Sequence, residues 1–174
     1  ELRRSIHERW FDWVKKANAD GSRDFYGMQK LIFRTMARDG ECFVRFRGRL
    51  PEDRLPVPLQ LQVLEADFCP IDLNREIPGG IIRAGKEFNG IGKCVAYWML
   101  RAHPGDPLMG KSIDPNPVRV DAQDILHVYL PDRPGQVRGV SWLAPIVLRL
   151  HNMDLYDDAL MWRQNLATAF VGVW

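Results

Sequence analysis

The sequence has no strong charge of either sign and no long hydrophobic run. Its 174 residues include 24 Lys and Arg against 22 Asp and Glu, which gives a formal net charge of +2. A charge this close to zero creates no general attraction to nucleic acid or to an anionic membrane, so any DNA contact must be local. No apolar run reaches the ~18 residues of a membrane helix, and no leader-like segment is present. The sequence therefore predicts neither a membrane span nor a signal peptide.

Cysteine is also scarce. The three cysteines, Cys42, Cys69 and Cys94, are odd in number and far apart. This pattern excludes a disulfide framework and a Cys-x-x-Cys metal or redox site, and it fits a reducing compartment. The four histidines have no ligand spacing with the cysteines, and no glycine-rich loop is followed by the lysine and Ser/Thr of a phosphate cradle. We therefore expect no metal, no cofactor and no bound nucleotide.

Apolar residues at helical spacing open the chain. Leu2, Ile6, Trp10, Trp13, Val14 and Ala17 recur at steps of three and four, which predicts a helix that ends before Asp20-Gly21. A second helix is expected from Asp24 to Arg38, with Asp39-Gly40 as the turn after it. The short polar connection between them suggests an antiparallel helix pair.

From Glu41 the hydrophobic period changes to two. Strands are expected at residues 42–47, 59–64, 81–83, 93–99, 118–120 and 125–129. Asn89-Gly90 is a strong hairpin signal and predicts that 81–83 pairs with 93–99. Short strands separated by close turn signals favour a small antiparallel sheet or a partly open barrel. The predicted fold class is α+β, with two N-terminal helices, this sheet and a long C-terminal helix.

A constrained loop precedes the last helix. Residues 133–145 contain two prolines and two glycines, and Ser141 offers a hydroxyl to the first turn of a helix expected from Trp142 to Phe170. Such a helix would be about 40 Å long, longer than the small sheet can cover. We therefore expect part of its apolar surface to meet another segment or another copy of the protein. The first residue, Glu1, and the missing stop signal after Phe170 predict a fragment of a longer protein.

Candidate catalytic residues are few. Glu65 and Asp67 are two apart near a strand end, and His127 is the one histidine in an apolar strand. A hydrolase domain using Glu65, Asp67 and His127 requires the three side chains to converge in one pocket. A polar strand edge and a hydrogen-bonded structural histidine are the simpler interpretations.

Alternating arginines suggest a second alternative. Arg45 and Arg47, with Phe43 and Phe46 around them, would form a basic and aromatic strip in a nucleic-acid-binding module. The same alternation is typical of the solvated face of a strand. No second basic cluster supports nucleic-acid binding.

Taken together, motifs over nearly the whole chain resemble the portal proteins of tailed bacteriophages, in the lambda-type family. Trp10-x-x-Trp13, the run from Arg38 to Phe43 and the run from Leu61 to Asp67 carry part of the resemblance. The strongest part is Arg133-Pro134-Gly135-Gln136-x-Arg138-Gly139-x-Ser141-Trp142-Leu143-Ala144-Pro145. Further matching segments are residues 20–21, 92–98, 124–129 and 155–159.

The resemblance implies a structural, non-enzymatic protein. Portal subunits form a ring, usually of twelve, at one capsid vertex, and double-stranded DNA passes through its channel without sequence-specific contacts. The implied partners are other portal subunits, the terminase that supplies the energy, the capsid and head-completion proteins, with no membrane. The implied location is the portal vertex of the virion, after assembly in the host cytoplasm.

The same resemblance suggests how the chain is divided. We expect a helical pair at 1–40, a β-rich, wing-like body at 41–132, and at 133–174 a loop and a truncated helix that leads toward the portal stem. The candidate residues for a subunit interface or for the sheet-to-helix junction are Arg133, Gln136, Arg138, Trp142 and Trp162.

Overall fold

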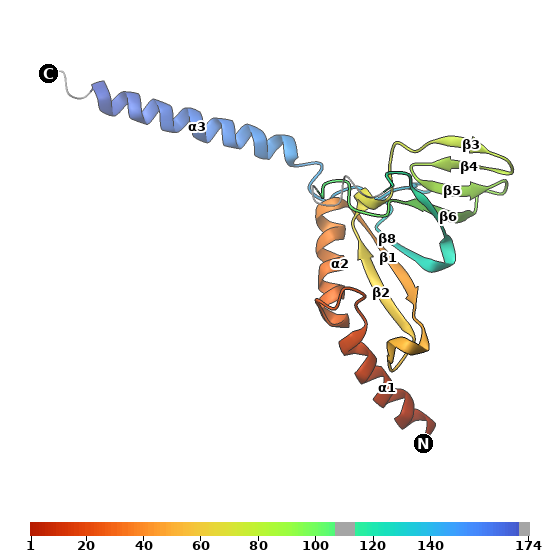
Figure 1. The fold of residues 1–174 in the computed structure, drawn as a ribbon. Helices are drawn as coiled ribbons and strands as arrows, with labels where there is room; N and C mark the ends of the chain where they lie inside the picture. The colour runs from red at the N-terminus through yellow and green to blue at the C-terminus, as the bar shows by residue number, and fades with distance from the viewer. Residues whose placement is uncertain (107–113, 171–174) are drawn as a thin grey trace. The chain divides into compact units, whose positions relative to one another are not determined.

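The computed structural model describes residues 1–106 and 114–170. The chain divides into two compact units, Glu1–Ser141 and Trp142–Trp174. The first unit contains two helices and two antiparallel sheets, and the second contains one long helix (Figure 1). The predicted α+β class, with two N-terminal helices and a long C-terminal helix, is confirmed.

The two N-terminal helices are α1 (Leu2–Lys16) and α2 (Phe25–Asp39). Asp24 caps α2, because its side chain accepts a 2.7 Å hydrogen bond from the Gly27 amide. Gly40 ends the helix with φ of 90°, a left-handed conformation that glycine adopts without strain, and its amide donates to the Met36 carbonyl. The predicted boundaries of the second helix are therefore confirmed to within one residue.

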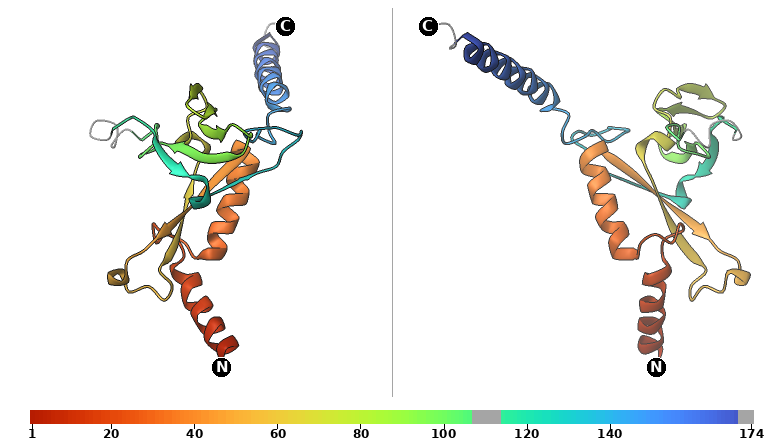
Figure 2. Two further views of the ribbon diagram at one scale, coloured as in Figure 1. Left: turned by 90° about the vertical axis from the view of Figure 1, so that its right-hand side faces the viewer. Right: turned by 60° about the vertical axis from the view of Figure 1, so that its left-hand side comes forward.

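The expected antiparallel helix pair is wrong. The helices follow one another end to end beside the same sheet (Figures 1 and 2), and they meet where the rings of Trp10 and Trp13 pack on Phe25. Between the helices, residues 17–19 run along the edge of a strand: the Leu61 amide donates to Ala17 and the Leu61 carbonyl accepts from Ala19. Because this stretch is held by the sheet, the chain cannot make the tight reversal of a helical hairpin.

The sheet that supports the helices has three antiparallel strands in the order β2-β1-β8. They are β1 (Glu41–Gly48), β2 (Leu59–Leu64) and β8 (Ile125–Tyr129). The second sheet has the order β3-β4-β5-β6-β7. Its strands are β3 (Arg75–Ile77), β4 (Gly80–Arg83), β5 (Lys86–Asn89), β6 (Cys94–Met99) and β7 (Val118–Asp121).

The predicted pairing of 81–83 with 93–99 is wrong, because β5 lies between β4 and β6. Ala84 and Gly85 both have positive φ, 50° and 77°, as a tight two-residue hairpin turn requires, and they reverse the chain directly after β4. The Asn89-Gly90 turn then joins β5 to β6. The polar residues Lys86 and Glu87 gave β5 no apolar pattern from which to predict a strand.

Two apolar cores lie on the two faces of the three-stranded sheet. Phe43 packs between the sheets with Leu64, Tyr97, Met99 and Ile125. The next residue of β1, Val44, belongs to the core under the helices, which also contains Trp13, Val14, Met28 and Leu61. Because neighbouring residues of a strand face opposite sides, β1 contributes to both cores at once. The strand is fully buried from Glu41 to Val44 for this reason.

Helix α3 (Val147–Phe170) forms the second unit and is about 36 Å long at 1.5 Å per residue. Its predicted start at Trp142 is five residues too early, since residues 142–146 form turns. Ser141 therefore lies six residues before the start of α3, and its hydroxyl donates to the Arg38 carbonyl at the end of α2. No helix in residues 1–106 or 114–170 combines the length and hydropathy needed to cross a bilayer.

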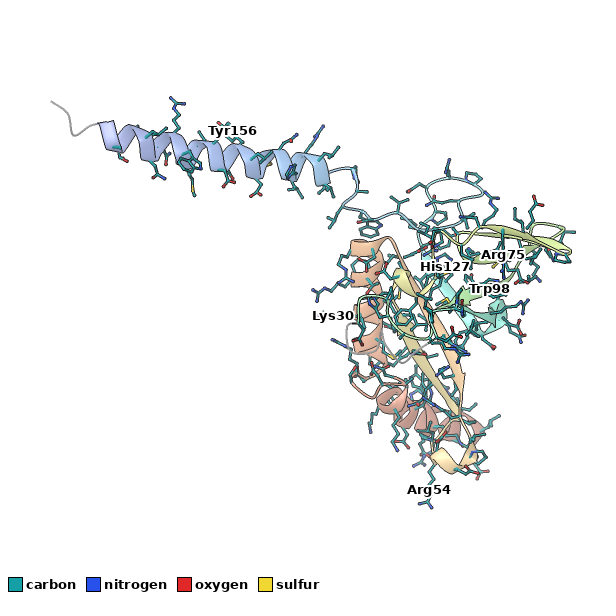
Figure 3. All side chains as sticks on the ribbon, turned by 45° about the horizontal axis from the view of Figure 1, so that its top comes forward. Lys30, Arg54, Arg75, Trp98, His127 and Tyr156 are labelled. Atoms are coloured by element: carbon teal, nitrogen blue, oxygen red, sulfur yellow. The ribbon has the colours of Figure 1, made fainter. Side chains whose placement is uncertain are left out.

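Large apolar side chains of α3 are exposed around the helix. Figure 3 shows side chains, Tyr156 among them, projecting on all sides. The following residues are between 53% and 76% exposed: Leu148, Leu150, Met153, Leu155, Tyr156, Met161, Trp162 and Leu166.

Candidate functional site

Arg138 ties three parts of the first unit together. It is almost fully buried, and its guanidinium forms an ion pair with Glu41 at the start of β1. It also donates to the carbonyls of Cys69 at 2.9 Å, Ala84 at 2.8 Å and Ala66 at 3.2 Å. Arginine suits this position because its planar fork directs five N–H donors in fixed directions. One side chain thus joins β1, the segment after β2 and the β4–β5 turn.

The Glu41 carboxylate is saturated with donors. Besides Arg138, it accepts from the Gly139 amide at 2.8 Å and contacts His127 Nε2 at 2.8 Å. Burial by itself would raise the pKa of Glu41, but the hydrogen bonds from His127 and Arg138, the charge of Arg138 and the Gly139 amide lower it to about 2. Glu41 is therefore charged at neutral pH and anchors residues 138–139.

His127, labelled in Figure 3, is held between two rings. Its imidazole stacks on Phe43 at 4.4 Å and on Tyr129 at 4.2 Å between centroids. Lys86 Nζ lies 3.2 Å from Nδ1 and donates to the Val137 carbonyl at 3.1 Å. An ammonium at Lys86 can only donate, so Nδ1 accepts and the imidazole proton lies on Nε2, facing Glu41. Burial lowers the pKa of both His127 and Lys86, and the neutral imidazole fits the positive groups around it.

We call Glu41, Lys86, His127 and Arg138 the buried polar junction. Each of the four side chains has hydrogen-bond partners, and each residue is at least nine-tenths buried or has a side chain only 3% exposed. A catalytic group needs access to a substrate, whereas these side chains are buried and hydrogen-bond to one another and to the backbone. The hydrogen bonds of the junction can hold the loop at 136–141 against both sheets and so stabilise the fold.

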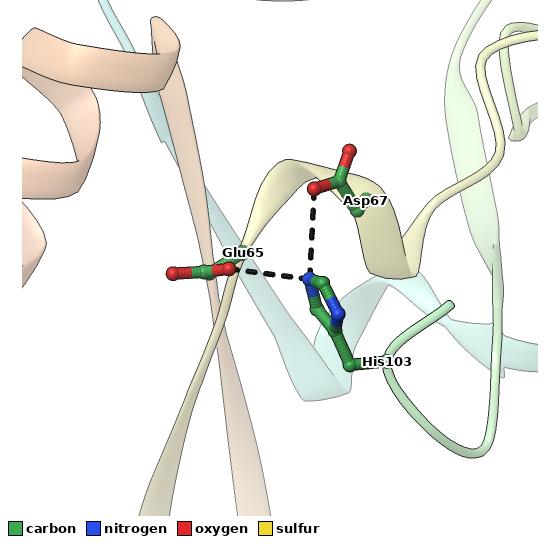
Figure 4. A group of neighbouring side chains, drawn as sticks. All are labelled: Glu65, Asp67 and His103. Carbon is green, nitrogen blue, oxygen red and sulfur yellow. Dashed lines mark ion pairs between the residues drawn. The ribbon is translucent and has the colours of Figure 1, made fainter. Parts of the chain in front are cut away.

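A second cluster contains Glu65, Asp67 and His103 (Figure 4). His103 Nε2 lies 3.3 Å from Glu65 and 3.5 Å from Asp67, and Glu65 also pairs with Arg38. The other ring nitrogen, Nδ1, accepts a 3.0 Å hydrogen bond from the Gly105 amide. The imidazole proton must then be on Nε2, where it faces the carboxylates and leaves no lone pair for a metal ion. The tautomer thus disfavours metal binding in this arrangement.

The hydrolase candidate set does not come together. Glu65 and Asp67 meet His103, while His127 is bound to Glu41 and Lys86. Within the part of the chain that the structure describes, no hydrogen bond or ion pair joins His127 to Glu65 or Asp67. Since direct acid/base cooperation needs contacts of roughly 3 Å, no observation favours this activity.

Arg45 and Arg47 lie two apart on β1 and are half-buried. The pKa of Arg45 is lowered by burial and by the positive charge of Arg47. Neither guanidinium forms an ion pair with any described residue. Their opposite neighbours on β2 are Gln62 and Gln60. Phe43 shares their face of the strand but is fully buried, and Phe46 faces the opposite side, so neither ring lies beside the two arginines as a surface for base stacking.

The other predicted interface residues differ in their surroundings. Gln136 organises its own loop, because its side chain accepts from the Asp132 amide and donates to the Arg138 carbonyl, both at 2.8 Å. Arg133 is exposed and has no side-chain hydrogen bond in the described part of the chain. Trp142 is 47% and Trp162 71% exposed.

Sequence reasoning missed three of the important groups. The sequence pattern indicates no role for Glu41 or Lys86, and His103 has no ligand spacing with any cysteine. A charged residue inside a predicted buried strand, such as Glu41 in front of Cys42, is the signal that an ion pair is needed. Nothing local in the sequence indicates that the partner is Arg138, 97 residues later.

Two comparisons place the chain among known proteins. The family model described as "Phage portal protein, lambda family" matches residues 1–174. A protein named "Probable portal protein" from Halomonas phage phiHAP-1 is 32% identical over 162 residues, which cover 91% of this chain and 30% of that relative. The chain therefore spans less than a third of the length of this curated relative.

Proposed function

The chain belongs to the lambda family of phage portal proteins, and from this premise we propose that it is part of a ring at one capsid vertex through which DNA is packaged and ejected. Proteins of this family have a structural role, and the buried polar junction would then keep the two sheets and the loop at 136–141 in a fixed arrangement. The proposed location is the portal vertex of the virion, with assembly in the host cytoplasm.

The observation that supports ring formation best is the surface of α3. Eight large apolar side chains on several sides of the helix, from Leu148 to Leu166, are each more than half exposed. Exposed apolar surface of this extent is typical of interfaces. In a cyclic ring, each copy presents one patch to a different patch of its neighbour, and α3 can supply one of them.

The charge of the chain supports a conducting role. DNA that moves through a channel must not be held by strong or sequence-specific contacts, and a net charge of +2 creates no strong general attraction. The proposed partners are further copies of the subunit in a twelvefold ring, the terminase, the capsid and head-completion proteins. Terminase would supply the energy by ATP hydrolysis.

A packaging assay with the full-length protein tests this function. Capsids assembled with the unchanged protein, terminase and ATP should protect DNA from nuclease, and capsids assembled without the protein should not. The double variant Leu155→Glu, Trp162→Glu should lose packaging, because two charges replace apolar contacts of α3. Gln164→Glu with Thr168→Glu adds the same charge to the same helix and should package normally. Full packaging without the protein would overturn the proposal.

A further inference from the structure

Helix α1, the start of β2 and the chain just before it form an apolar groove that is open to solvent. We define the α1 groove by its lining residues Ile6, Arg9, Trp10, Trp13, Val57 and Leu59; its volume is about 350 Å³. Ile6 is 59% and Trp10 41% exposed, whereas Trp13 forms the floor and is anchored by a 2.7 Å hydrogen bond from its Nε1 to the Leu59 carbonyl. A groove with a rigid tryptophan floor suits the apolar face of a helix.

The helix that forms one wall of this groove carries more basic than acidic side chains, and Arg9 lines the groove itself. Helix α1 contains five basic and two acidic side chains. Both acidic groups are paired, Glu8 with Arg4 and Asp12 with Lys15. Arg9, which lines the groove, has no ion pair among the described residues. An occupant with acidic groups beside an apolar strip would therefore fit better than a basic one.

Helix α3 has this complementary pattern. We define the α3 strip as Leu148, Leu155, Ala159, Trp162 and Leu166, which share one face because their spacings are seven, four, three and four residues. Asp154 and Asp158 lie along one side of this strip, one turn apart. Neither aspartate forms an ion pair in residues 1–106 or 114–170. The strip is thus apolar with Asp154 and Asp158 along one border and Arg163 along the other, and the groove is apolar with Arg9 in its lining.

We propose that the α1 groove of one portal subunit binds the α3 strip of a neighbouring subunit. The proposal rests on the ring proposed above and specifies which two surfaces meet in it. Each copy carries one groove and one strip, so the contact is head to tail and can repeat from copy to copy around a ring. Trp162 and Leu155 enter the groove over Trp10 and Trp13, and Asp154 and Asp158 face Arg9.

Mixed cross-linking of the full-length protein tests the contact. One set of copies carries the substitution Ile6→Cys. A second set, made larger by a fused tag, carries Leu155→Cys. The two sets are assembled together, and a short bifunctional maleimide is added. Because the two cysteines are on different chains, a linked pair of unequal copies can arise only between subunits. Ile91→Cys replaces Ile6→Cys in the control, since Ile91 is highly exposed on the β5–β6 turn and outside the groove. The unchanged protein controls for the native cysteines.

The proposal predicts unequal dimers from the Ile6→Cys mixture and none from the Ile91→Cys mixture. Intact rings without these dimers would overturn it and leave the proposed ring function standing. If the unchanged full-length protein forms no ring, the proposed function itself fails, and this contact fails with it.

Charge reversal provides an independent readout. Arg9→Asp or Asp158→Arg alone should weaken association about fivefold, and the two changes together should restore it. Arg4→Asp is the matched control, because Arg4 is on α1 but does not line the groove. Equal effects of Arg9→Asp and Arg4→Asp, without restoration in the double variant, would overturn the pairing.

Discussion

The backbone of Gly139 lies directly against the backbone of Gly40. A Cβ atom on Gly139 would come within 2.1 Å of the Gly40 carbonyl oxygen, and a Cβ atom on Gly40 would come within 2.3 Å of the Val140 carbonyl carbon. No side chain fits between them. The end of α2 and the loop at 133–141 are therefore fixed to one another at the point where Glu41 accepts the Gly139 amide.

Gly139→Ala should destabilise the first unit. The added methyl group must displace backbone, and we expect the free energy of unfolding to fall by about 3 kcal/mol. Urea denaturation measures this change. Gly48→Ala is the control, because its Cβ atom meets nothing within 4 Å. Equal stabilities of the two variants would show that the backbones are not in contact.

Arg138→Ala should be far more damaging than Arg133→Ala. Removing Arg138 leaves Glu41 charged and buried without its cation, which should cost about 4 kcal/mol. The exposed Arg133 has no side-chain partner in the described chain, and its loss should change stability by less than about 0.5 kcal/mol. Urea denaturation at neutral pH measures the change in the free energy of unfolding for both variants. Similar losses in both variants would contradict the junction as described.

Stability should fall on acidification because of Glu41. Its pKa is lowered in the folded protein to about 2, so below its ordinary value of 4.5 the unfolded chain binds more protons than the folded one. The associated stability is present above pH 4.5 and is lost as pH falls toward 2, by about 3 kcal/mol in total. Unfolding measured across this range should show the slope, and Glu41→Gln should reduce it. If the free energy of unfolding of Glu41→Gln depends on pH as steeply as that of the unchanged protein, other carboxylates and not Glu41 cause the loss.

His127 should add a second pH-dependent loss. Burial lowers the pKa of His127 in the folded protein below its ordinary 6.5, so the unfolded chain takes up a proton first as pH falls. Stability should therefore begin to decrease below about pH 6.5. In His127→Gln the decrease between pH 6.5 and 5 should disappear. NMR titration of the His127 ring offers a direct check, and an apparent pKa above 6.5 would contradict the assignment.

The cluster of Glu65, Asp67 and His103 should not depend on a metal ion. Since His103 Nδ1 accepts the Gly105 amide, Nε2 carries the proton and cannot coordinate. A chelator should leave the melting temperature unchanged, and a calorimetric titration with Zn²⁺ should give the same trace for the unchanged protein and for His103→Ala. A chelator-sensitive melting temperature that loses its sensitivity in His103→Ala would overturn this interpretation.

The parts of the fold with local signals could be predicted from the sequence. Asp24 and Gly40 mark the ends of α2, and the alternation in residues 42–47 and 59–64 marks β1 and β2. The end-to-end placement of α1 and α2 could not be predicted, because it depends on hydrogen bonds between residues 17–19 and Leu61 on a strand far along the chain. The strand β5 could not be predicted from an apolar pattern, because its buried residues Lys86 and Glu87 are polar and are buried through polar contacts.

The candidate site could be predicted only in part, because its contacts join residues that are far apart in the sequence. The composition of the loop at 133–145 indicated a rigid junction with its arginines, but Arg133 and Arg138 look alike in sequence. Their difference arises from tertiary structure, which gives Arg138 one carboxylate and three carbonyl acceptors. Likewise, the partner of Glu65 and Asp67 is His103, and only the packing of the chain reveals it.

The mass of the assembled full-length protein shows whether this chain is part of a closed ring. Native mass spectrometry under assembly-permissive conditions should give a closed oligomer of one fixed copy number, with twelve as the expected value. Leu155→Glu with Trp162→Glu should shift the mass toward the monomer, and Gln164→Glu with Thr168→Glu should not. A full-length protein that remains monomeric under these conditions would contradict the account of this chain as part of a ring-forming portal subunit.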